Sequence, residues 1–363
     1  MPLPRRRPSA RRAAWAVPAV AAVAVASAVV LPSTLASAGP PRLPERTAAD
    51  LLASLAGSSA TPLEGTVVQT ARLGLPELPA GSSGTTPLAM LTGSHTLRVW
   101  SDGPERVRLA LLGELAEYDV VRDGRDAWTY SSEQDEAVHH LLPAGREHAR
   151  GTGPVAPPTP QDAAKSVLEA VEPTTAVRVD TMARVAGRDA YQLVVEPRDP
   201  GSLVGSVRLA VDAATSVPLR VQVWSVQDAQ EPALEVGFTE VSFDRPDATV
   251  FDFVAPADAQ VREVVVPGHE GGHDGRPGAE RGGRPSGDSP AEVTGEGWAR
   301  VVELPGAGGT PDGEAAGALD SLTTRVPEGR LLQTALLTGL LTDDGRLLVG
   351  AVPADRLRES ARG

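Results

Sequence analysis

Hydrophobic and polar residues alternate along much of the chain. Residues 105–112 (ERVRLALL), 205–212 (GSVRLAVD) and 233–243 (ALEVGFTEVSF) each repeat with a period of two. Successive side chains of a strand point to opposite faces, so each segment has one apolar face and one polar face. Repeated over many short segments, this pattern predicts an antiparallel sheet with one buried face.

Residues 117–143 are predicted to form three short strands of this sheet. Asp123-Gly124 separates the first two strands, and this dipeptide favours a tight hairpin because glycine reaches positive φ without steric cost. Trp128 and Tyr130 are two residues apart, so both rings leave the same face of their strand.

Two helices are predicted among the strands. Thr47 and Asp50 cap the first, over residues 46–57, and Thr159 with Asp162 begins the second, which runs to about residue 172. Further strands are expected at residues 63–73, 94–101, 176–185, 187–196, 218–224 and 297–304, a helix at 315–325, a hairpin at 329–352 and a terminal helix at 354–361.

Residues 1–38 have the three parts of an export signal. Arginines between Arg5 and Arg12 precede an apolar run at 13–31, and Ala36-Ser37-Ala38 is a small-residue cleavage site. The apolar run approaches the length of a membrane span, so an uncleaved anchor helix is the alternative. Both interpretations place the rest of the protein outside the cytoplasm.

Composition excludes several classes of protein. Hydrophobic residues make up 41% of the chain and aromatic residues only 3%, so the core is expected to consist mainly of Leu, Val and Ala. Without residues 1–38, 29 basic residues remain against 47 acidic ones, a net charge of −18 that argues against binding nucleic-acid phosphates. The absence of cysteine excludes disulfides, thiolate metal sites and a lipid-modified cysteine.

Residues 263–295 are rich in Gly and Pro and are predicted to be a disordered linker before a small module at 296–363. This linker contains His269-Glu270-Gly271-Gly272-His273, which matches the HExxH pattern of zinc peptidases. Zinc binding by this pattern needs a helix, and the two glycines within the motif and the Gly and Pro residues around it disfavour a helix.

A second pair of histidines, His139-His140, lies on a predicted strand, so the two rings are expected on opposite faces. We expect no catalytic residues, no metal site and no cofactor.

The strand pattern resembles the LolA-like superfamily, which includes lipoprotein carriers, the stress regulator RseB and mycobacterial lipid-binding lipoproteins of the LppX type. The segments that carry the resemblance include 93–109, 116–132, 185–198, 204–223, 236–243 and 340–353. The resemblance implies a mainly β fold with α-helices (α+β), in which an open, strongly curved antiparallel sheet, an unclosed β-barrel, is covered by short helices. It also implies a carrier domain over residues 39–262.

The resemblance further implies an apolar cavity for acyl chains between the sheet and the helices. The inward-facing candidates are Leu97, Val99, Val107, Leu109, Leu111, Trp128, Tyr130, Leu193, Val207, Leu209 and Val236, and the candidates on the covering helices are Leu51, Leu55, Leu168 and Val171. Periodicity selects these residues but does not say which face of the sheet lines a cavity.

Three functions remain open from the sequence. The first is an exported, non-enzymatic protein that binds lipid, an acyl chain or a lipoprotein. The second is an RseB-like regulator that binds an anti-sigma factor, and the third is a zinc peptidase that uses residues 269–273.

Overall fold

The computed structural model of the protein describes residues 43–75, 85, 89–142, 156–170, 174–198, 200–265, 292–304 and 321–362. Among these residues, no helix has the length and apolar character needed to span a membrane. The predicted signal at 1–38 and the HEGGH motif at 269–273 lie outside the described residues.

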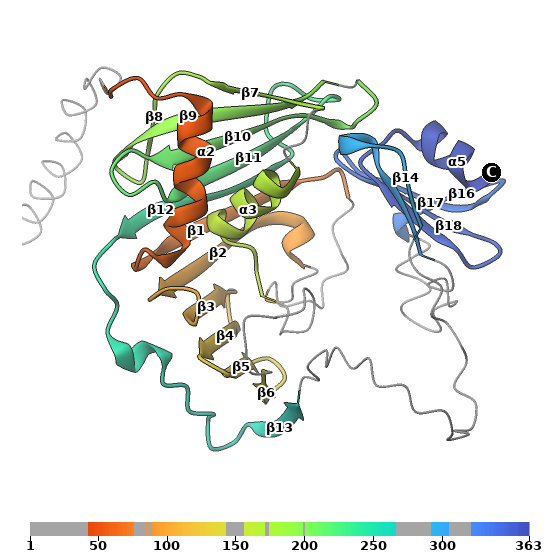
Figure 1. Ribbon diagram of the computed structural model, residues 1–363. Helices are drawn as coiled ribbons and strands as arrows, with labels where there is room; N and C mark the ends of the chain where they lie inside the picture. Colours follow the sequence, from red (N-terminus) through yellow and green to blue (C-terminus); the bar gives the residue numbers. More distant parts are fainter. Residues whose placement is uncertain are drawn as a thin grey trace, which may run out of the picture. The chain divides into compact units, whose positions relative to one another are not determined.

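Most of the described chain forms one 13-stranded sheet, in which the order is β13-β6-β5-β4-β3-β2-β1-β12-β11-β10-β9-β7 and β8 pairs with β9 (Figure 1). All neighbouring strands are antiparallel except β13 and β6, so the prediction of a mainly β, mostly antiparallel open sheet is confirmed. The strands are β1 (Leu63–Arg72), β2 (Thr92–Ser101), β3 (Arg106–Leu112), β4 (Glu117–Asp123), β5 (Asp126–Ser131), β6 (Glu136–Leu141), β7 (Thr175–Val179), β8 (Ala183–Val185), β9 (Arg188–Pro197), β10 (Val204–Asp212), β11 (Pro218–Ser225), β12 (Leu234–Ser242) and β13 (Gln260–Val265).

The period-two pattern gives this sheet two chemically different faces. Leu97 of β2 lies opposite Leu111 of β3 and Val67 of β1, and the register carries the same face through β12 to Val221 of β11 and Leu209 of β10. We call this the inner face, because α2 (Ala48–Gly57) and α3 (Pro160–Ala170) lie over it (Figure 1). The other side is the outer face.

Both helices begin as their sequences predict. The Thr47 hydroxyl accepts a hydrogen bond from the Asp50 backbone N–H at 3.1 Å, and the Asp50 carboxylate accepts one from the Thr47 backbone N–H. Thr159 and Asp162 repeat this capping box at the start of α3. These bonds satisfy backbone donors that a helix start leaves unpaired, so both helix starts are fixed.

The large sheet has two apolar clusters, and α2 packs into one of them. Leu51 of α2 is fully buried in one cluster with Leu193, Leu209 and other residues of strands β9–β11. A second cluster around Leu97 draws mainly on strands β1–β4 and β12, with further residues from β8–β11. The apolar stripe of α2 therefore covers the inner face, as its spacing predicts.

Two strands differ from prediction. Residues 176–185 form two strands, β7 and β8, because Asp180 begins a turn in which its carboxylate accepts a hydrogen bond from the Thr181 N–H at 2.8 Å. Strand β13 pairs with β6 in parallel and was not predicted, because its residues are all exposed and lack a clear alternation. The Asp123-Gly124 hairpin is confirmed, with Gly124 at φ 63°.

A long segment connects β12 to β13 along the outer face. It contains η3 (Ala248–Phe251), in which Phe251 is buried, and Arg108 of β3 donates a hydrogen bond to the Val250 carbonyl. This connecting segment places β13 at the far edge of the sheet, beside β6 (Figure 1).

The remaining strands form a six-stranded sheet, in the order β14-β15-β19-β18-β17-β16. Its apolar core, which includes Leu340, Leu348 and Leu357, is separate from the two clusters of the large sheet. Its elements are β14 (Glu292–Thr294), η4 (Gly297–Ala299), β15 (Val301–Leu304), β16 (Thr324–Val326), β17 (Gly329–Gln333), β18 (Thr338–Thr342), β19 (Leu347–Gly350) and α5 (Ala354–Arg362). The predicted strand at 297–304 therefore begins with a 3-10 turn. Of the predicted helix at 315–325, residues 315–320 lie outside the described residues, 321–322 are helical and β16 begins at Thr324.

Backbone hydrogen bonds join the second sheet to the first. The Leu203 N–H donates to the Ala351 carbonyl at 2.7 Å, and the Ala335 N–H donates to the Leu73 carbonyl at 2.9 Å. Leu336 is buried in the cluster under α2. The division into domains at residues 263–295 stays a prediction.

Candidate functional site

A cavity lies between the inner face and the helices α2 and α3. Its volume is about 740 Å³, within the roughly 300–1,000 Å³ of typical small-molecule sites. Strands β1–β4 and β11 form one wall, while the end of α2, the turn after it and α3 form the other. We call it the inner-face cavity.

The strand register builds the apolar wall of the inner-face cavity. Val99 of β2 lies opposite Leu109 of β3, so both side chains project from the same face, together with Val107. Leu55 of α2 and Leu168 of α3 close the cavity from the helix side. Val107 and Leu168 are only half-buried, so they present apolar surface that a ligand could cover. The remaining apolar lining residues are Leu63, Pro104, Ala164 and Pro218.

The turn after α2 and the first turn of α3 supply polar groups to the same cavity. The Ser58 hydroxyl donates to the Leu55 carbonyl at 2.8 Å, and the Thr159 hydroxyl donates to the Asp162 carboxylate at 2.6 Å. The amide of Gln161 also lines the cavity, and its oxygen has no hydrogen-bond donor among the described residues. The site therefore has an apolar floor with a polar side at the start of α3.

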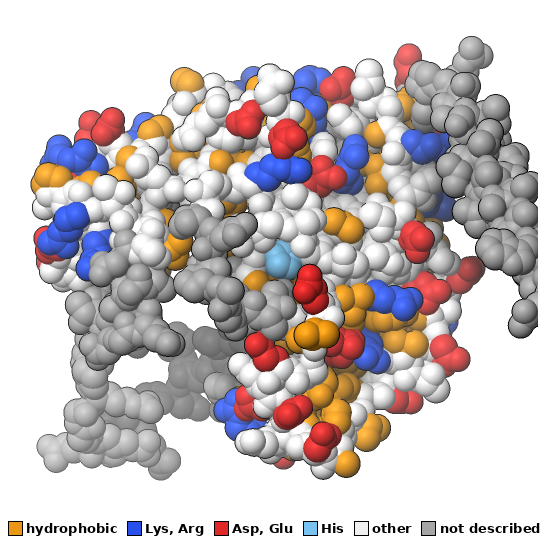
Figure 2. Space-filling model, turned by 180° about the vertical axis from the view of Figure 1, so that it is seen from behind, with side chains coloured by type: hydrophobic (Ala, Val, Ile, Leu, Met, Phe, Trp, Pro, Cys, Tyr) orange, Lys and Arg blue, Asp and Glu red, His pale blue; other side chains and the backbone are white. Residues whose placement is uncertain are grey.

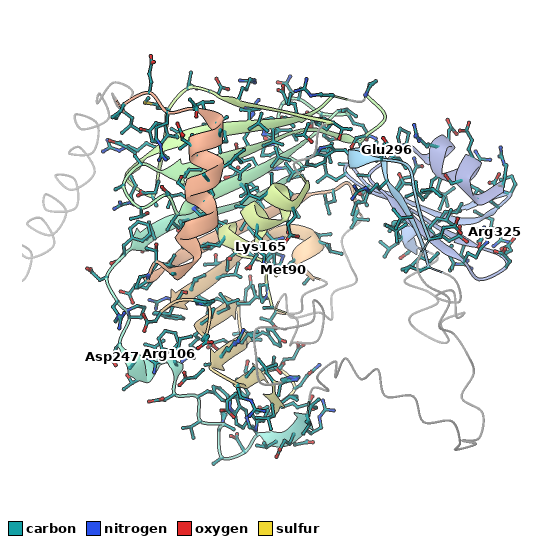
Figure 3. The ribbon with its side chains drawn as sticks, in the orientation of Figure 1. Met90, Arg106, Lys165, Asp247, Glu296 and Arg325 are labelled. Carbon is teal, nitrogen blue, oxygen red and sulfur yellow. The ribbon has the colours of Figure 1, made fainter. Side chains whose placement is uncertain are left out.

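Charged side chains of both signs line the cavity. Arg122 of β4 and Lys165 of α3 are basic, and Asp162 and Glu169 of α3 are acidic. Lys165, labelled on α3 in Figure 3, is the only lysine of the chain. Because the two signs balance, Coulomb attraction does not favour an anionic ligand over a neutral one.

The structure brings most predicted cavity residues to one face but not to one site. All the predicted residues of the sheet except Trp128 and Tyr130 project from the inner face. Val99, Val107 and Leu109 line the cavity, and so do Leu55 and Leu168 of the covering helices. The others are packed in the core: Leu97, Leu111 and Val236 lie in one cluster, and Leu51, Leu193, Val207 and Leu209 lie in the other. Val171 lies outside the described residues.

Trp128 and Tyr130 lie on the outer face. Trp128 pairs across the strands with Val121, whereas the inward residue of that part of β4 is Val120, opposite Leu109. The Trp128 ring is 5.3 Å from the ring of Phe253 and the Tyr130 ring is 6.2 Å from it, measured between centroids. These aromatic residues hold the segment between β12 and β13 against the sheet. Figure 2 views this face, where apolar side chains lie among many charged ones.

Sequence reasoning missed the polar side of the cavity. Ser58 and Thr61 lie in a turn without periodicity, and Gln161 lies in the capping sequence of α3, so the sequence gives no signal that they face a cavity. Arg122 could have been found, because it is two residues beyond Val120 on the same strand and therefore shares its face.

The two histidines of β6 lie on opposite faces, as predicted. His139 stacks on Trp128 on the outer face, with ring centroids 4.4 Å apart, and its Nε2 is 2.8 Å from a carboxylate oxygen of Asp126. His140 lies toward Thr129 on the inner face, where burial lowers the pKa of its imidazole. Among the described residues, no group of His, Asp and Glu side chains is arranged to hold a metal ion.

Comparisons with known proteins give structural matches only. No family model and no curated protein sequence matches the chain. One chain of the Pseudomonas aeruginosa MucA/MucB complex is 22% identical, with 86% of this chain and 96% of that chain covered at a TM-score of 0.42. A LolA superfamily protein from Nitrosomonas europaea is 11% identical, with 57% of this chain and 98% of that chain covered at a TM-score of 0.23. LprF from Mycobacterium bovis is 11% identical, with 59% of this chain and 97% of that chain covered at a TM-score of 0.30. These values do not assign the chain to a family.

Proposed function

We propose that the protein is an exported, non-enzymatic binder of lipid, which holds an acyl chain in the inner-face cavity. The observation that carries this proposal is a cavity of about 740 Å³ with an apolar wall of strand and helix residues. The apolar run and cleavage site of residues 1–38 support export.

The energetics of the cavity fit an acyl chain. Moving one methylene from water into an apolar site contributes about 0.8 kcal/mol, so a chain that fills the cavity gains affinity without any charged contact. Val107 and Leu168, which are half-buried without a ligand, lose their remaining contact with water when a chain covers them. The polar side near Ser58 and Gln161 is available to a head group.

A substitution that fills the cavity tests this proposal. Val107→Trp places a large ring in the cavity wall, and Leu112→Trp places the same ring on the outer face of the same strand, where Leu112 is already 38% exposed. Delipidated wild-type protein and Leu112→Trp are expected to bind a fluorescent fatty acid, and Val107→Trp is expected to lose most of this binding. Thermal unfolding of both variants verifies that they are folded.

Native mass spectrometry adds a test that needs no probe. Protein purified from the expressing cell is expected to carry co-purifying lipid in the wild type and less in Val107→Trp. If the wild type neither takes up the fatty acid nor carries lipid, the proposal fails.

A second candidate function is an envelope regulator that binds an anti-sigma factor. The supporting observation is the six-stranded sheet, which has its own core around Leu340 and Leu348 and contributes none of its described residues to the inner-face cavity. We propose that residues 39–262 and 296–363 are separate domains and that the second one offers the surface for such a partner. MucB has been solved in complex with MucA(peri).

The two candidates differ in what they capture. A pull-down from solubilised membranes is expected to recover an anti-sigma factor if the regulator proposal holds, and a chain that lacks residues 296–363 is expected to lose it. If Val107→Trp recovers as much anti-sigma factor as the wild type does, binding of this partner does not depend on acyl-chain binding.

A further inference from the structure

Strand β13 is an open edge of the large sheet. It stands at one end of the strand order and, among the described residues, pairs only with β6 (Figure 1). The free side of an edge strand carries backbone N–H and C=O groups that can pair with another chain. All six residues of β13 are exposed, and Val261 and Val265 are 56% and 66% exposed. Proteins usually blunt or cover such an edge, so two exposed valines on it favour a partner that covers them.

The edge is already formed without a partner. The Gln260 N–H donates a hydrogen bond to the Asp135 carbonyl at 2.6 Å, and the Arg262 guanidinium forms an ion pair with the Glu136 carboxylate. Just before β13, the ring of Phe253 packs on the aromatic side chains of β5. A partner therefore meets an ordered strand, and binding does not carry the entropic cost of ordering it.

The register of β13 defines which side chains a partner strand would meet. Val261, Glu263 and Val265 are two residues apart and therefore share one face. Glu263 lies opposite His139, which stacks on Trp128, so this is the outer face. A strand that pairs with the free edge places every second side chain beside these three, whichever way it runs. The edge thus presents an apolar, an acidic and an apolar position in turn.

The uncompensated charge at this edge is acidic. Arg262, the only basic residue of β13, is neutralised by Glu136. Asp135, Asp258 and Glu263 are exposed, and none of them has an ion-pair partner among the described residues. A symmetric pair of copies would bring Glu263 close to its own equivalent, and like charges across strands are destabilising. The charge therefore favours a basic partner over a second copy of this chain.

We propose that the free edge of β13 binds an extended peptide segment of a partner protein, with a Lys or Arg opposite Glu263. Apolar residues two positions away on either side of this Lys or Arg lie opposite Val261 and Val265. Backbone hydrogen bonds supply affinity in such strand addition, and the alternate side chains supply selectivity. No described residue of β5, β6 or β13 lines the inner-face cavity, so this site goes beyond acyl-chain binding and does not depend on it.

Two matched peptides and two matched variants test the side-chain part of the proposal. The fluorescent peptide Thr-Val-Thr-Lys-Thr-Val-Thr and its analogue with Glu in place of Lys are titrated with the full chain at low ionic strength. The wild type is expected to bind the Lys peptide about fivefold more tightly than the Glu peptide. Glu263→Lys is expected to reverse this preference. Glu240→Lys makes the same change at an exposed residue of β12, opposite Thr66, and is expected to keep the wild-type preference.

Backbone pairing is tested by methylating peptide nitrogens. The N–H groups of alternate residues in a strand point to the same side, so only one of the two alternate sets can face β13. One Lys peptide is methylated on the nitrogens of Val and Lys, and another on the nitrogens of the Thr residues between them. One of the two is expected to lose binding and the other to keep it. Equal affinities of the two methylated peptides, whether high or low, would overturn strand pairing.

Absence of binding, or a preference for Lys over Glu that Glu263→Lys leaves unchanged, overturns the proposal. Sedimentation equilibrium adds a further outcome: a wild type that dimerises and a Val261→Lys variant that does not would show that a second copy occupies the edge. Fatty-acid uptake by Glu263→Lys is expected to equal that of the wild type, because Glu263 does not line the inner-face cavity. Normal uptake verifies the fold, and loss of peptide binding alone leaves acyl-chain binding intact.

Discussion

Replacing Leu51 or Leu168 by alanine is expected to change the free energy of unfolding by different amounts, because Leu51 lies in the packed core and Leu168 borders the cavity. Both leucines lie on helices over the sheet, and alanine retains helix propensity in both places. Leu51 is 0% exposed and packs with Leu193 and Leu209, so its truncation leaves a void among side chains that cannot close. Leucine-to-alanine changes at such sites cost about 2–5 kcal/mol, and we expect about 3 kcal/mol here.

Leu168 is half-buried and borders an existing cavity. Its truncation creates no new void and loses only part of the roughly 1.5–3 kcal/mol that full burial of a leucine contributes, so we expect about 1 kcal/mol. Urea denaturation of the delipidated proteins measures both values, provided that the m-values agree. Equal destabilisation by the two changes would show that Leu168 is packed in a filled core, and the cavity would then be absent in solution.

The same two variants differ in ligand binding. Leu168→Ala removes apolar surface from the cavity wall and is expected to weaken binding of an acyl chain several-fold. Leu51→Ala, measured at a temperature where it is fully folded, is expected to bind as the wild type does, because Leu51 does not line the cavity.

Two further predictions concern charged groups. Burial of Asp212 favours its neutral form, but hydrogen bonds from Arg188 and from Thr215 outweigh this effect and lower the pKa of the carboxyl. Arg188→Met is therefore expected to lower the free energy of unfolding by about 3 kcal/mol in urea denaturation at pH 7. The control Arg184→Met, which breaks an exposed ion pair with Asp189, is expected to cost less than about 1 kcal/mol. Hydrogen bonds from Arg358 and Arg362 lower the pKa of Glu328 from 4.5 to about 2, so this carboxylate stabilises the fold above pH 4.5 and the contribution is lost as the pH falls toward 2. Unfolding midpoints at pH 6 and pH 3 are expected to differ less in Glu328→Gln than in the wild type, and an unchanged difference would contradict this.

The alternating pattern predicted which residues within one strand share a face. It did not predict which faces of neighbouring strands lie on the same side of the sheet. Val99, Val107 and Leu109 share one face and line the cavity, because β2 and β3 pair with their apolar residues opposite each other. Trp128 and Tyr130 followed the same spacing, yet the hairpin at Gly124 places Trp128 opposite Val121 and turns both rings outward. A register difference of one residue changes the face of every side chain, and only the paired strands determine it.

Other parts of the site have no local signal. The difference between a packed and a hollow inner face depends on where α2 and α3 lie over the sheet, which their apolar spacing does not specify. The segment between β12 and β13 crosses the outer face, where Phe251 is buried and Phe253 packs on Trp128 and Tyr130, a long-range contact that strand patterns do not reveal. The only sequence feature that suggested packing of this segment was the pair of aromatic residues, Phe251 and Phe253, in a predicted loop.

The affinity of delipidated protein for acyl chains of increasing length tests acyl-chain binding most directly. If the cavity holds the chain, each added methylene contributes about 0.8 kcal/mol, or about a fourfold gain in affinity, until the cavity of about 740 Å³ is filled and the gain stops. An affinity that does not depend on chain length, or a wild-type protein that binds none of the chains, would contradict the account.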